Sequence, residues 1–404
     1  TTGLRAVDSP APVQVLGADV LRRVGQPDLT QALAQNVPSI TAQAFGSDTA
    51  AFNLSIKLRG VSPNHTLVLV NGKRRHGTAN VAVSGGPYGG GAAADLSLIP
   101  TASIDHVEVL LDGAAAQYGT DAIAGVVNII QKKNTSGGSI NINGGQYFDG
   151  GGLTADLMAN VGLAPTDKSY LNMSFETKFK DFSFRGDVDP RVINTPAAGN
   201  ISTNLLGRFP GLVNAKDYPY VNRIAGDAQQ RLRTFTFNAG YELTPDIEIY
   251  SFGTYGYKFG QAYENYRVPT VVTGVAATDI AYPLGFSPKE SITESDYAIT
   301  GGIQGTTNDW HWDLSSTYGK DTAEVSVLAS ANASLYRDSS TATRKGVTPE
   351  TFHAGDFLTS QWTTTFDLSK EFDIGLAGPL NFASGVEYRK EMYSIRQGDP
   401  TSYY

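Results

Sequence analysis

The 404-residue chain contains no cysteine. This absence excludes disulfide scaffolds, thiolate zinc sites, iron–sulfur clusters and cysteine nucleophiles. The chain also lacks a continuous apolar run of the roughly 18 residues that mark a transmembrane helix. The sequence therefore predicts neither a disulfide-stapled fold nor a helical membrane protein.

Charged residues are scarce, at 17% of the chain against about 25% in a typical soluble protein. The 31 Lys and Arg are outnumbered by 39 Asp and Glu, which gives a net charge of −8. That balance argues against a nucleic-acid partner, which would need a basic excess. Glycine (44 residues) and aromatic residues (10%) take the place of charge, and this composition favours β structure.

The chain changes character part-way along, so we expect two domains, 1–134 and 135–404. In the first, Asp28 is expected to cap a short helix. The Asn71-Gly72 pair predicts a tight hairpin turn. Short strand signals occur at 56–58, 66–70, 107–111 and 125–130. Together these features predict a small mixed α/β domain.

The second domain consists of long segments in which apolar and polar residues alternate. The apolar residues Leu171, Met173 and Phe175, for example, are separated by single polar residues. Such alternation gives a β-strand one apolar and one polar face. Nine segments show the pattern: 138–147, 151–163, 168–181, 230–243, 246–259, 295–306, 309–326, 356–370 and 379–396.

The connections between these segments alternate in length. The short ones are 164–167, 244–245, 307–308 and 375–378, and the long ones are 182–229, 260–294 and 327–355. Outer-membrane barrels have short turns on the periplasmic side and long loops outside. The alternative is a soluble all-β protein with one solvated face. Soluble strands average about five or six residues, and these segments are longer, so the pattern favours the membrane barrel.

Three motifs in the first domain strongly resemble the plug domain of TonB-dependent outer-membrane receptors. They read IKLRG at 56–60, TLVLVNG at 66–72 and IDHVEVLLDGAAAQYGTDAIAGVVNII at 104–130. The family shows an I-R-G-like motif, a V-L-V-D-G-like hairpin and a block ending in G-V-I-N-I-I, in the same order. The second domain resembles the barrel of this family, so the resemblance covers nearly the whole chain.

The resemblance implies a small α/β plug followed by antiparallel transmembrane β-strands in the bacterial outer membrane. In this family TonB, energised by an inner-membrane complex, drives the import of a substrate too bulky or too scarce for porins. A ferric siderophore-like chelate is the first expectation. A carbohydrate or other organic nutrient is the second, because the D-G-A-x-A-x-Y-G variant at 112–119 also occurs in receptors of that kind. The alternative is a non-transporting structural or adhesive barrel protein.

The chain departs from the family pattern at three points. Leu111 stands where many members have Arg or Lys, so a charged contact with the barrel wall is expected to be missing. The N-terminal residues look like those that follow a TonB box, so the box itself is expected to be absent. Family barrels have roughly 22 strands, whereas nine are found here. We therefore expect either the N-terminal part of a longer receptor or one of two chains that close a barrel together. Outer-membrane lipid and a surface lipoprotein complete the expected partners.

Charged residues in the plug motifs are candidates for a lock between plug and barrel. By resemblance, Arg59 and Glu108 belong to such a lock, and lumen-facing Glu176, Glu242 or Glu387 could complete it. A charged lock suits a plug that moves, because ion pairs can exchange partners with water or with TonB. The alternative is that these residues are ordinary solvated charges.

Substrate contacts are expected on plug loops that point outward. Arg74, Arg75 and His76 follow the hairpin turn and could bind an anionic substrate such as a ferric chelate. A solvated charge cluster in the lumen is the alternative. The loop from Asn80 to Tyr88 is the better-placed candidate, because Tyr88 offers a ring and a hydroxyl among flexible glycines.

No catalytic, cofactor or metal site is expected, so the sequence does not predict an enzyme. The five histidines share no metal-ligand spacing. The glycine run at 85–91 lacks the G-K-[ST] ending of a phosphate loop. No G-x-S-x-G nucleophile elbow occurs, and the acidic residues are scattered.

Overall fold

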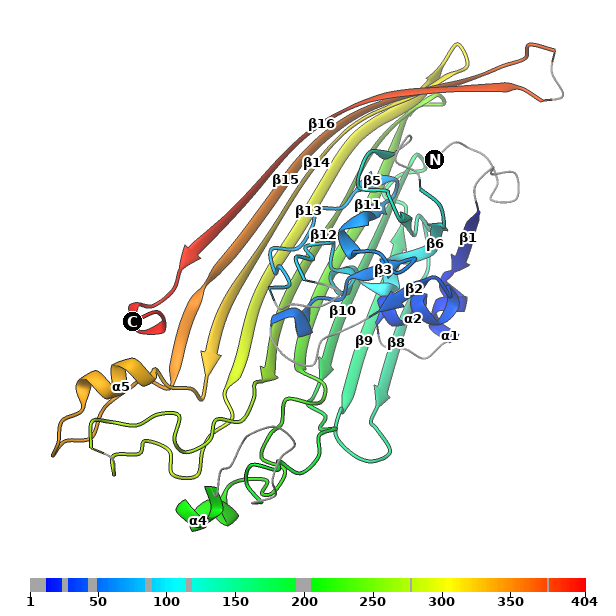
Figure 1. Ribbon diagram of the computed structural model, residues 1–404. Helices are drawn as coiled ribbons and strands as arrows, with labels where there is room; N and C mark the ends of the chain where they lie inside the picture. The colour runs from blue at the N-terminus through cyan, green and yellow to red at the C-terminus, as the bar shows by residue number, and fades with distance from the viewer. Residues whose placement is uncertain are drawn as a thin grey trace.

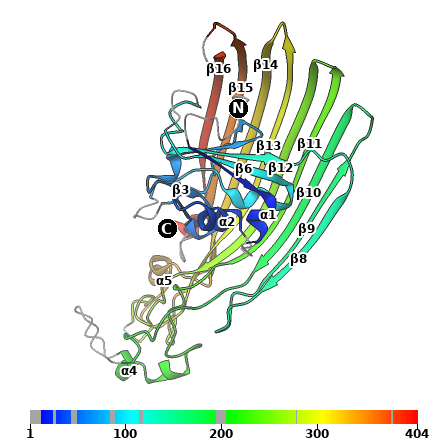
Figure 2. The same ribbon diagram turned by 90° about the vertical axis from the view of Figure 1, so that its right-hand side faces the viewer.

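The computed structural model shows a compact N-terminal region lying against the inner face of a long, curved sheet (Figures 1 and 2). It describes residues 12–23, 28–42, 49–83, 89–113, 118–193, 205–276, 278–375 and 378–404.

The N-terminal region is built on a five-stranded sheet in the order β1-β6-β7-β4-β5. β4 and β7 are parallel, and the other neighbours are antiparallel. The strands are β1 (Val13–Gly17), β4 (Thr66–Val70), β5 (Lys73–Arg74), β6 (Ile104–Leu110) and β7 (Gly125–Gln131), with a separate pair of β2 (Ile40–Ala42) and β3 (Ile56–Leu58). The helices are α1 (Ala18–Arg23) and α2 (Leu29–Asn36), with 3₁₀ turns at Thr49–Phe52, Pro63–His65, Leu96–Leu98 and Thr101–Ser103.

Two local predictions in this region can be compared with the structure. Asn71 (φ 49°) and Gly72 (φ 79°) close the two-residue turn between β4 and β5, as their sequence predicts. Asp28 occupies the N-cap position of α2, but its side chain makes no capping hydrogen bond. Its carboxylate instead accepts a hydrogen bond from Lys178 Nζ at 2.9 Å, on the long sheet. The tertiary ion pair takes the place of the local cap.

The long sheet contains nine antiparallel strands, each paired with the next in sequence. The strands are β8 (Gly138–Gly145), β9 (Thr154–Leu163), β10 (Ser169–Lys180), β11 (Gln229–Thr244), β12 (Ile247–Tyr263), β13 (Lys289–Thr307), β14 (Trp310–Leu328), β15 (Thr351–Phe372) and β16 (Leu380–Gln397). This architecture confirms the predicted fold class. β13 and β15 begin several residues before their predicted starts, 295 and 356. A strand that extends beyond the apolar band of a membrane no longer needs an apolar face, so the alternation fades there.

Long and short connections lie at opposite ends of the sheet (Figure 1). The long connections include α4 (Leu205–Arg208), the 3₁₀ turn Pro210–Asn214 and α5 (Ala333–Ser339), and a last 3₁₀ turn, Pro400–Ser402, follows β16. Across the described ranges, no helix is long and apolar enough to cross a membrane. The plug strands end at Gln131 and the long sheet begins at Gly138. The expected domain boundary, between 134 and 135, falls in this interval and stays a prediction.

Candidate functional site

The N-terminal region meets the long sheet along inward-facing positions of β12. Three successive inward positions are Gly256, Lys258 and Gly260. The two glycines leave space for side chains of the N-terminal region. A Cβ at Gly256 would lie 2.7 Å from Leu98 Cδ2, and a Cβ at Gly260 would overlap the Phe52 ring. Larger residues at these two positions would therefore displace the side chains that pack there.

Lys258 lies between the two glycines and is completely buried. Its Nζ donates to the carbonyl oxygen of Phe52 at 2.8 Å and to Glu294 Oε2 at 2.6 Å, and it forms an ion pair with Asp95. Asp95 Oδ1 is fixed in turn by two backbone N–H groups of the N-terminal region, at 3.3 and 2.8 Å. Removing an ion from water costs several kcal/mol, so a buried ammonium needs this complete set of partners.

A second contact lies next to Glu294, on β14. Asp321 Oδ2 accepts a hydrogen bond from the backbone N–H of Ala79 at 2.7 Å and lies 3.0 Å from Thr78 Oγ1. The same Thr78 hydroxyl lies 3.3 Å from Glu294 Oε1. On β16, the Tyr393 hydroxyl donates to the Ala79 carbonyl oxygen at 3.0 Å. The segment around Ala79 is thus held by three barrel strands.

Arg75 and His76 share a carboxylate on β13. Arg75 forms an ion pair with Asp296 and donates to Thr254 Oγ1 at 2.8 Å. His76 Nε2 lies 3.2 Å from the other oxygen of Asp296, and its Nδ1 lies 2.9 Å from the Gly77 carbonyl oxygen. Burial is the main cause that lowers the pKa of His76, and the charge of Arg75 adds to it, while Asp296 acts in the opposite direction.

Lys73 and Arg74 contact the barrel nearer the short turns. Lys73 Nζ lies 3.1 Å from Asp313 and 3.4 Å from Asp367. Arg74 pairs with Asp121 of the N-terminal region at 2.5 Å. The same Asp121 oxygen pairs with Arg389 of β16, also at 2.5 Å. This carboxylate therefore joins a cation of the N-terminal region to a cation of the wall.

A further group of contacts lies on β10. Glu176 Oε2 accepts a hydrogen bond from the backbone N–H of Thr101 at 2.9 Å. Lys178 Nζ lies 2.9 Å from Asp28 and 3.3 Å from Glu176. The N-terminal region is thus attached to the sheet by charged and polar contacts that extend from β10 to β16. Apolar packing also contributes, because Tyr250 and Phe252 of β12 join its core.

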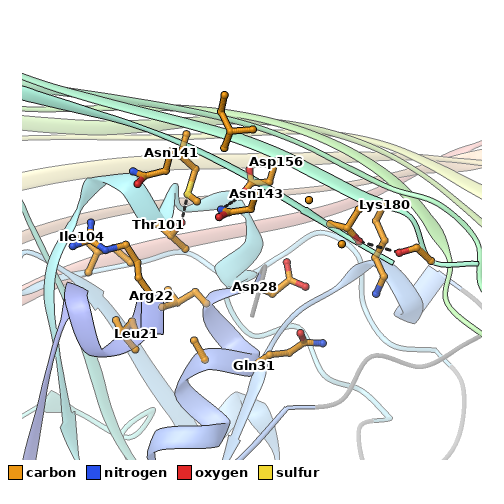
Figure 3. Close-up of a pocket in the computed structure, with 18 of the residues that line it drawn as sticks. Leu21, Arg22, Asp28, Gln31, Thr101, Ile104, Asn141, Asn143, Asp156 and Lys180 are labelled. Atoms are coloured by element: carbon orange, nitrogen blue, oxygen red, sulfur yellow. Dashed lines mark hydrogen bonds between the residues drawn. The ribbon is translucent and has the colours of Figure 1, made fainter. Parts of the chain in front are cut away.

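A cavity of about 820 Å³ lies between α1, α2 and the first strands of the sheet. Figure 3 shows Arg22, Asp28 and Gln31 on one side and Asn143 and Asp156 on the other. The cavity lies beside β8, the end strand of the nine-stranded sheet. In the described part of the chain, no three His, Asp or Glu side chains are grouped as metal ligands.

Comparison with protein families gives an independent view of the N-terminal region. Residues 5–126 match the model of the TonB-dependent receptor plug domain. This chain carries the plug of a TonB-dependent receptor, followed by part of its barrel.

Two curated relatives of the receptor come from bacteria, and the name of the first places it in the outer membrane. The iron-regulated outer membrane virulence protein of Vibrio cholerae serotype O1 is 26% identical over 242 residues, which cover 60% of this chain and 30% of the relative. The probable TonB-dependent siderophore receptor PirA of Acinetobacter baumannii is 40% identical over 84 residues, 21% of this chain and 11% of the relative. The receptor is accordingly a protein of the bacterial outer membrane.

Solved structures share the fold of the whole chain. The siderophore receptor PirA from Acinetobacter baumannii aligns with a TM-score of 0.62 and 18% identity, covering 96% of this chain and 49% of that one. A mutant of the ferric enterobactin receptor PfeA from Pseudomonas aeruginosa aligns with a TM-score of 0.62 and 17% identity, covering 98% and 50%. The chain thus spans about half the length of these receptors.

The two plug residues predicted for the lock make their ion pairs and hydrogen bonds inside the plug. Arg59 Nη1 lies 3.5 Å from Asp112, and both side chains are at least half exposed. Glu108 accepts a hydrogen bond from Asn128 Nδ2 at 2.8 Å and lies 3.6 Å from His106. Their role in a plug-to-barrel lock stays a prediction.

The three barrel carboxylates predicted as lock partners differ from one another. Glu176 accepts its hydrogen bond from plug Thr101, and Glu387 lies 3.4 Å from plug Arg74. Glu242 is exposed near the short turn that ends β11. The structure therefore brings two of the three carboxylates to the plug.

The residues predicted to bind substrate are engaged in other contacts. Arg74 pairs with Asp121, and Arg75 and His76 both contact Asp296. Asn80 is buried and donates from Nδ2 to the Thr49 carbonyl oxygen at 2.8 Å. Tyr88 lies outside the described residues. The substrate role of these five residues stays a prediction; Arg75, His76 and Asn80 are buried, and Arg74 is partly buried.

Several plug-to-barrel residues were missed by sequence reasoning. They are Asp95, Lys258, Glu294, Asp296 and Asp321. A signal was available on the barrel side, because an inward lysine between two inward glycines is unusual on a strand. No comparable signal identified Asp95, whose partner is 163 residues away.

Proposed function

We propose that the receptor imports a ferric siderophore-like chelate across the outer membrane, with energy delivered through TonB. The observation that carries this proposal is the buried, charged contact between plug and wall, centred on Lys258. The names of two curated relatives, an iron-regulated outer membrane virulence protein and a probable siderophore receptor, support an iron chelate as the substrate.

The chemistry of the contact suits a plug that has to move. An apolar interface of this extent would expose its whole area to water when it opened, and burial stabilises by about 25 cal/mol per Å². Ion pairs lose less on opening, because each charge regains water as it loses its partner. A pulling force applied by TonB could therefore release Lys258, Arg75 and their carboxylates in succession.

The substrate proposal has one competitor, a carbohydrate or other organic nutrient. The motif at 112–119 is compatible with either substrate. Cells grown under iron limitation should produce more receptor if the substrate is a ferric chelate. If a sugar polymer raises the amount of receptor and iron limitation does not, the carbohydrate or other organic nutrient is supported as the substrate instead.

Uptake of a radiolabelled ferric chelate by cells that carry the complete receptor tests the mechanism. We expect saturable uptake that disappears in cells without TonB and when the segment preceding the plug is deleted. Uptake that survives this deletion would contradict TonB coupling. If cells take up a labelled oligosaccharide in a TonB-dependent way but do not take up the chelate, the TonB-coupled mechanism is supported. The substrate would then be a carbohydrate and not a ferric chelate.

A further inference from the structure

The outward face of β11 carries two cations to which the transport proposal gives no role. Thr236 of β11 accepts a hydrogen bond from plug Gln131, so even-numbered residues of this strand face the plug and odd-numbered ones face away. Arg231 and Arg233 lie on the outward face, and both are exposed. In the described part of the chain, neither guanidinium forms an ion pair with a carboxylate.

Aromatic rings flank both arginines. The Arg231 guanidinium lies 5.7 Å from the centre of the Phe179 ring, and Phe259 is paired with Arg231 on its other side. Tyr257 is paired with Arg233. Rings in this position are typical of the aromatic girdle of a barrel at the membrane interface. The two arginines are therefore placed at the level of lipid head groups.

A third cation lies further toward the long loops. Lys289 is the first residue of β13, and its ammonium lies 5.7 Å from the centre of the Tyr263 ring and 5.8 Å from that of Phe182. Figure 1 shows that this end of the sheet is the end that carries α4 and α5. Long loops mark the external side of an outer-membrane barrel, so the three cations face the outer leaflet.

The acids nearest to the two arginines do not form ion pairs with them. We call Arg231, Arg233 and Lys289 the outer-leaflet patch. Asp181, at the end of β10, accepts a hydrogen bond from a β11 glutamine at 2.9 Å and forms no ion pair with Arg231. On the other side, the cross-strand pairs lead from Arg231 to Phe259 on β12, Thr293 on β13 and Glu324 on β14. The first acid in this direction is therefore three strands away. Across the described residues, the two arginines of the patch therefore have no carboxylate as an ion-pair partner, whereas Lys289 lies next to Glu290 in the chain.

We propose that the outer-leaflet patch binds the phosphate-bearing head group of an anionic lipid in the outer leaflet. Arginine presents a planar fork that donates two hydrogen bonds to one phosphate. Arg231 and Arg233 project from the same face of one strand, two residues apart, so both can serve one head group. The adjacent Phe179, Tyr257 and Phe259 rings offer an apolar surface to the first part of the acyl chains.

Titration of the complete receptor with two lipid probes tests this site. The receptor is purified in a neutral detergent, and the probes are dioleoyl phosphatidic acid and uncharged dioleoylglycerol. Each cation near an anionic surface contributes roughly a fivefold change in affinity. We therefore expect R231Q/R233Q to bind phosphatidic acid at least about tenfold more weakly at low ionic strength, with dioleoylglycerol binding unchanged.

A matched variant separates a defined site from net charge. Arg337 and Lys345 are exposed on α5 and the loop that follows it, so R337Q/K345Q removes the same charge elsewhere on the external side. This variant should bind phosphatidic acid as the unmodified receptor does. Equal affinity of R231Q/R233Q and the unmodified receptor would overturn the proposal. An equal loss in both double variants would also overturn it, because the lipid would then respond to net charge alone.

The unmodified receptor provides a measurement that needs no variant. Raising the ionic strength from about 0.05 to about 0.5 M shortens the Debye length severalfold and should weaken phosphatidic acid binding. Binding that does not change with salt would overturn the proposal even if R231Q/R233Q fails to fold.

Discussion

Replacing Lys258 with methionine would leave two buried carboxylates without their cation. The substitution keeps most of the side-chain length but removes the contacts to Asp95, to Glu294 and to the Phe52 carbonyl oxygen. Breaking a buried ion pair by removing one partner costs about 3–5 kcal/mol. We expect a loss of this size in the free energy that holds the plug segment at 52–58 against β12.

Hydrogen exchange of plug amides measures this free energy directly, since local opening sets the exchange rate. Each 1.4 kcal/mol is a factor of ten, so amides in 52–58 and 95–99 should exchange about 100- to 4000-fold faster in Lys258→Met. Lys320→Met is the matched control. Lys320 lies on β14 at an outward position and, among the described residues, has no ion-pair partner. Its replacement should leave plug exchange unchanged.

A combined variant tests the electrostatic explanation. Lys258→Met together with Asp95→Asn and Glu294→Gln removes the ion and both of its counter-ions, so most of the lost protection should return. If Lys258→Met accelerates plug exchange less than tenfold, or if the combined variant is no better protected, the reasoning about a buried ionic contact is refuted.

Two further predictions concern the packing of the plug against the long sheet. Gly260→Val should displace Phe52 and raise the protease sensitivity of the plug. Gly301→Val should not raise it, because a Cβ at Gly301 meets no atom within 4 Å. Equal protease sensitivity of the two variants would contradict the packing argument. The pKa of His76 is lowered in the docked plug from its ordinary value of 6.5, so the undocked state takes up the proton more readily. Docking should therefore be strongest above about pH 6.5 and weaken as the pH falls through that value. The urea midpoint for loss of the plug, measured from pH 5 to pH 8, should show this slope, and His76→Gln should flatten it; a slope that persists in His76→Gln would assign the effect to another group.

Sequence reasoning predicted the elements well because their signals are local. The turn at Asn71-Gly72 and the alternation along the barrel strands depend on residues next to one another in the chain. The plug motifs at 56–60, 66–72 and 104–130 likewise gave the family, in agreement with the match at 5–126.

The contacts of the site depend on distant residues, and this explains what was missed. Lys258 and Asp95 are 163 residues apart, and Asp28 and Lys178 are 150 apart. Which lumen-facing carboxylate meets which plug cation is set by strand register and by the rotation of the plug, and neither is encoded in a short stretch of sequence. Glu176 and Glu387, which were considered as lock partners, do contact the plug, while their role in a lock stays a prediction. Glu294 was not considered.

A reversible tether between plug and wall tests the central claim that the plug must leave the wall during transport. A Cβ at Gly256 would lie 3.4 Å from Leu98 Cβ, close to the spacing of about 3.5–4.5 Å in a disulfide. The chain has no cysteine of its own, so Leu98→Cys with Gly256→Cys introduces a single defined pair. We predict that cells with the oxidised variant bind the ferric chelate at the surface but do not import it, and that a reductant restores uptake. Undiminished uptake with the disulfide shown to be intact would contradict the account.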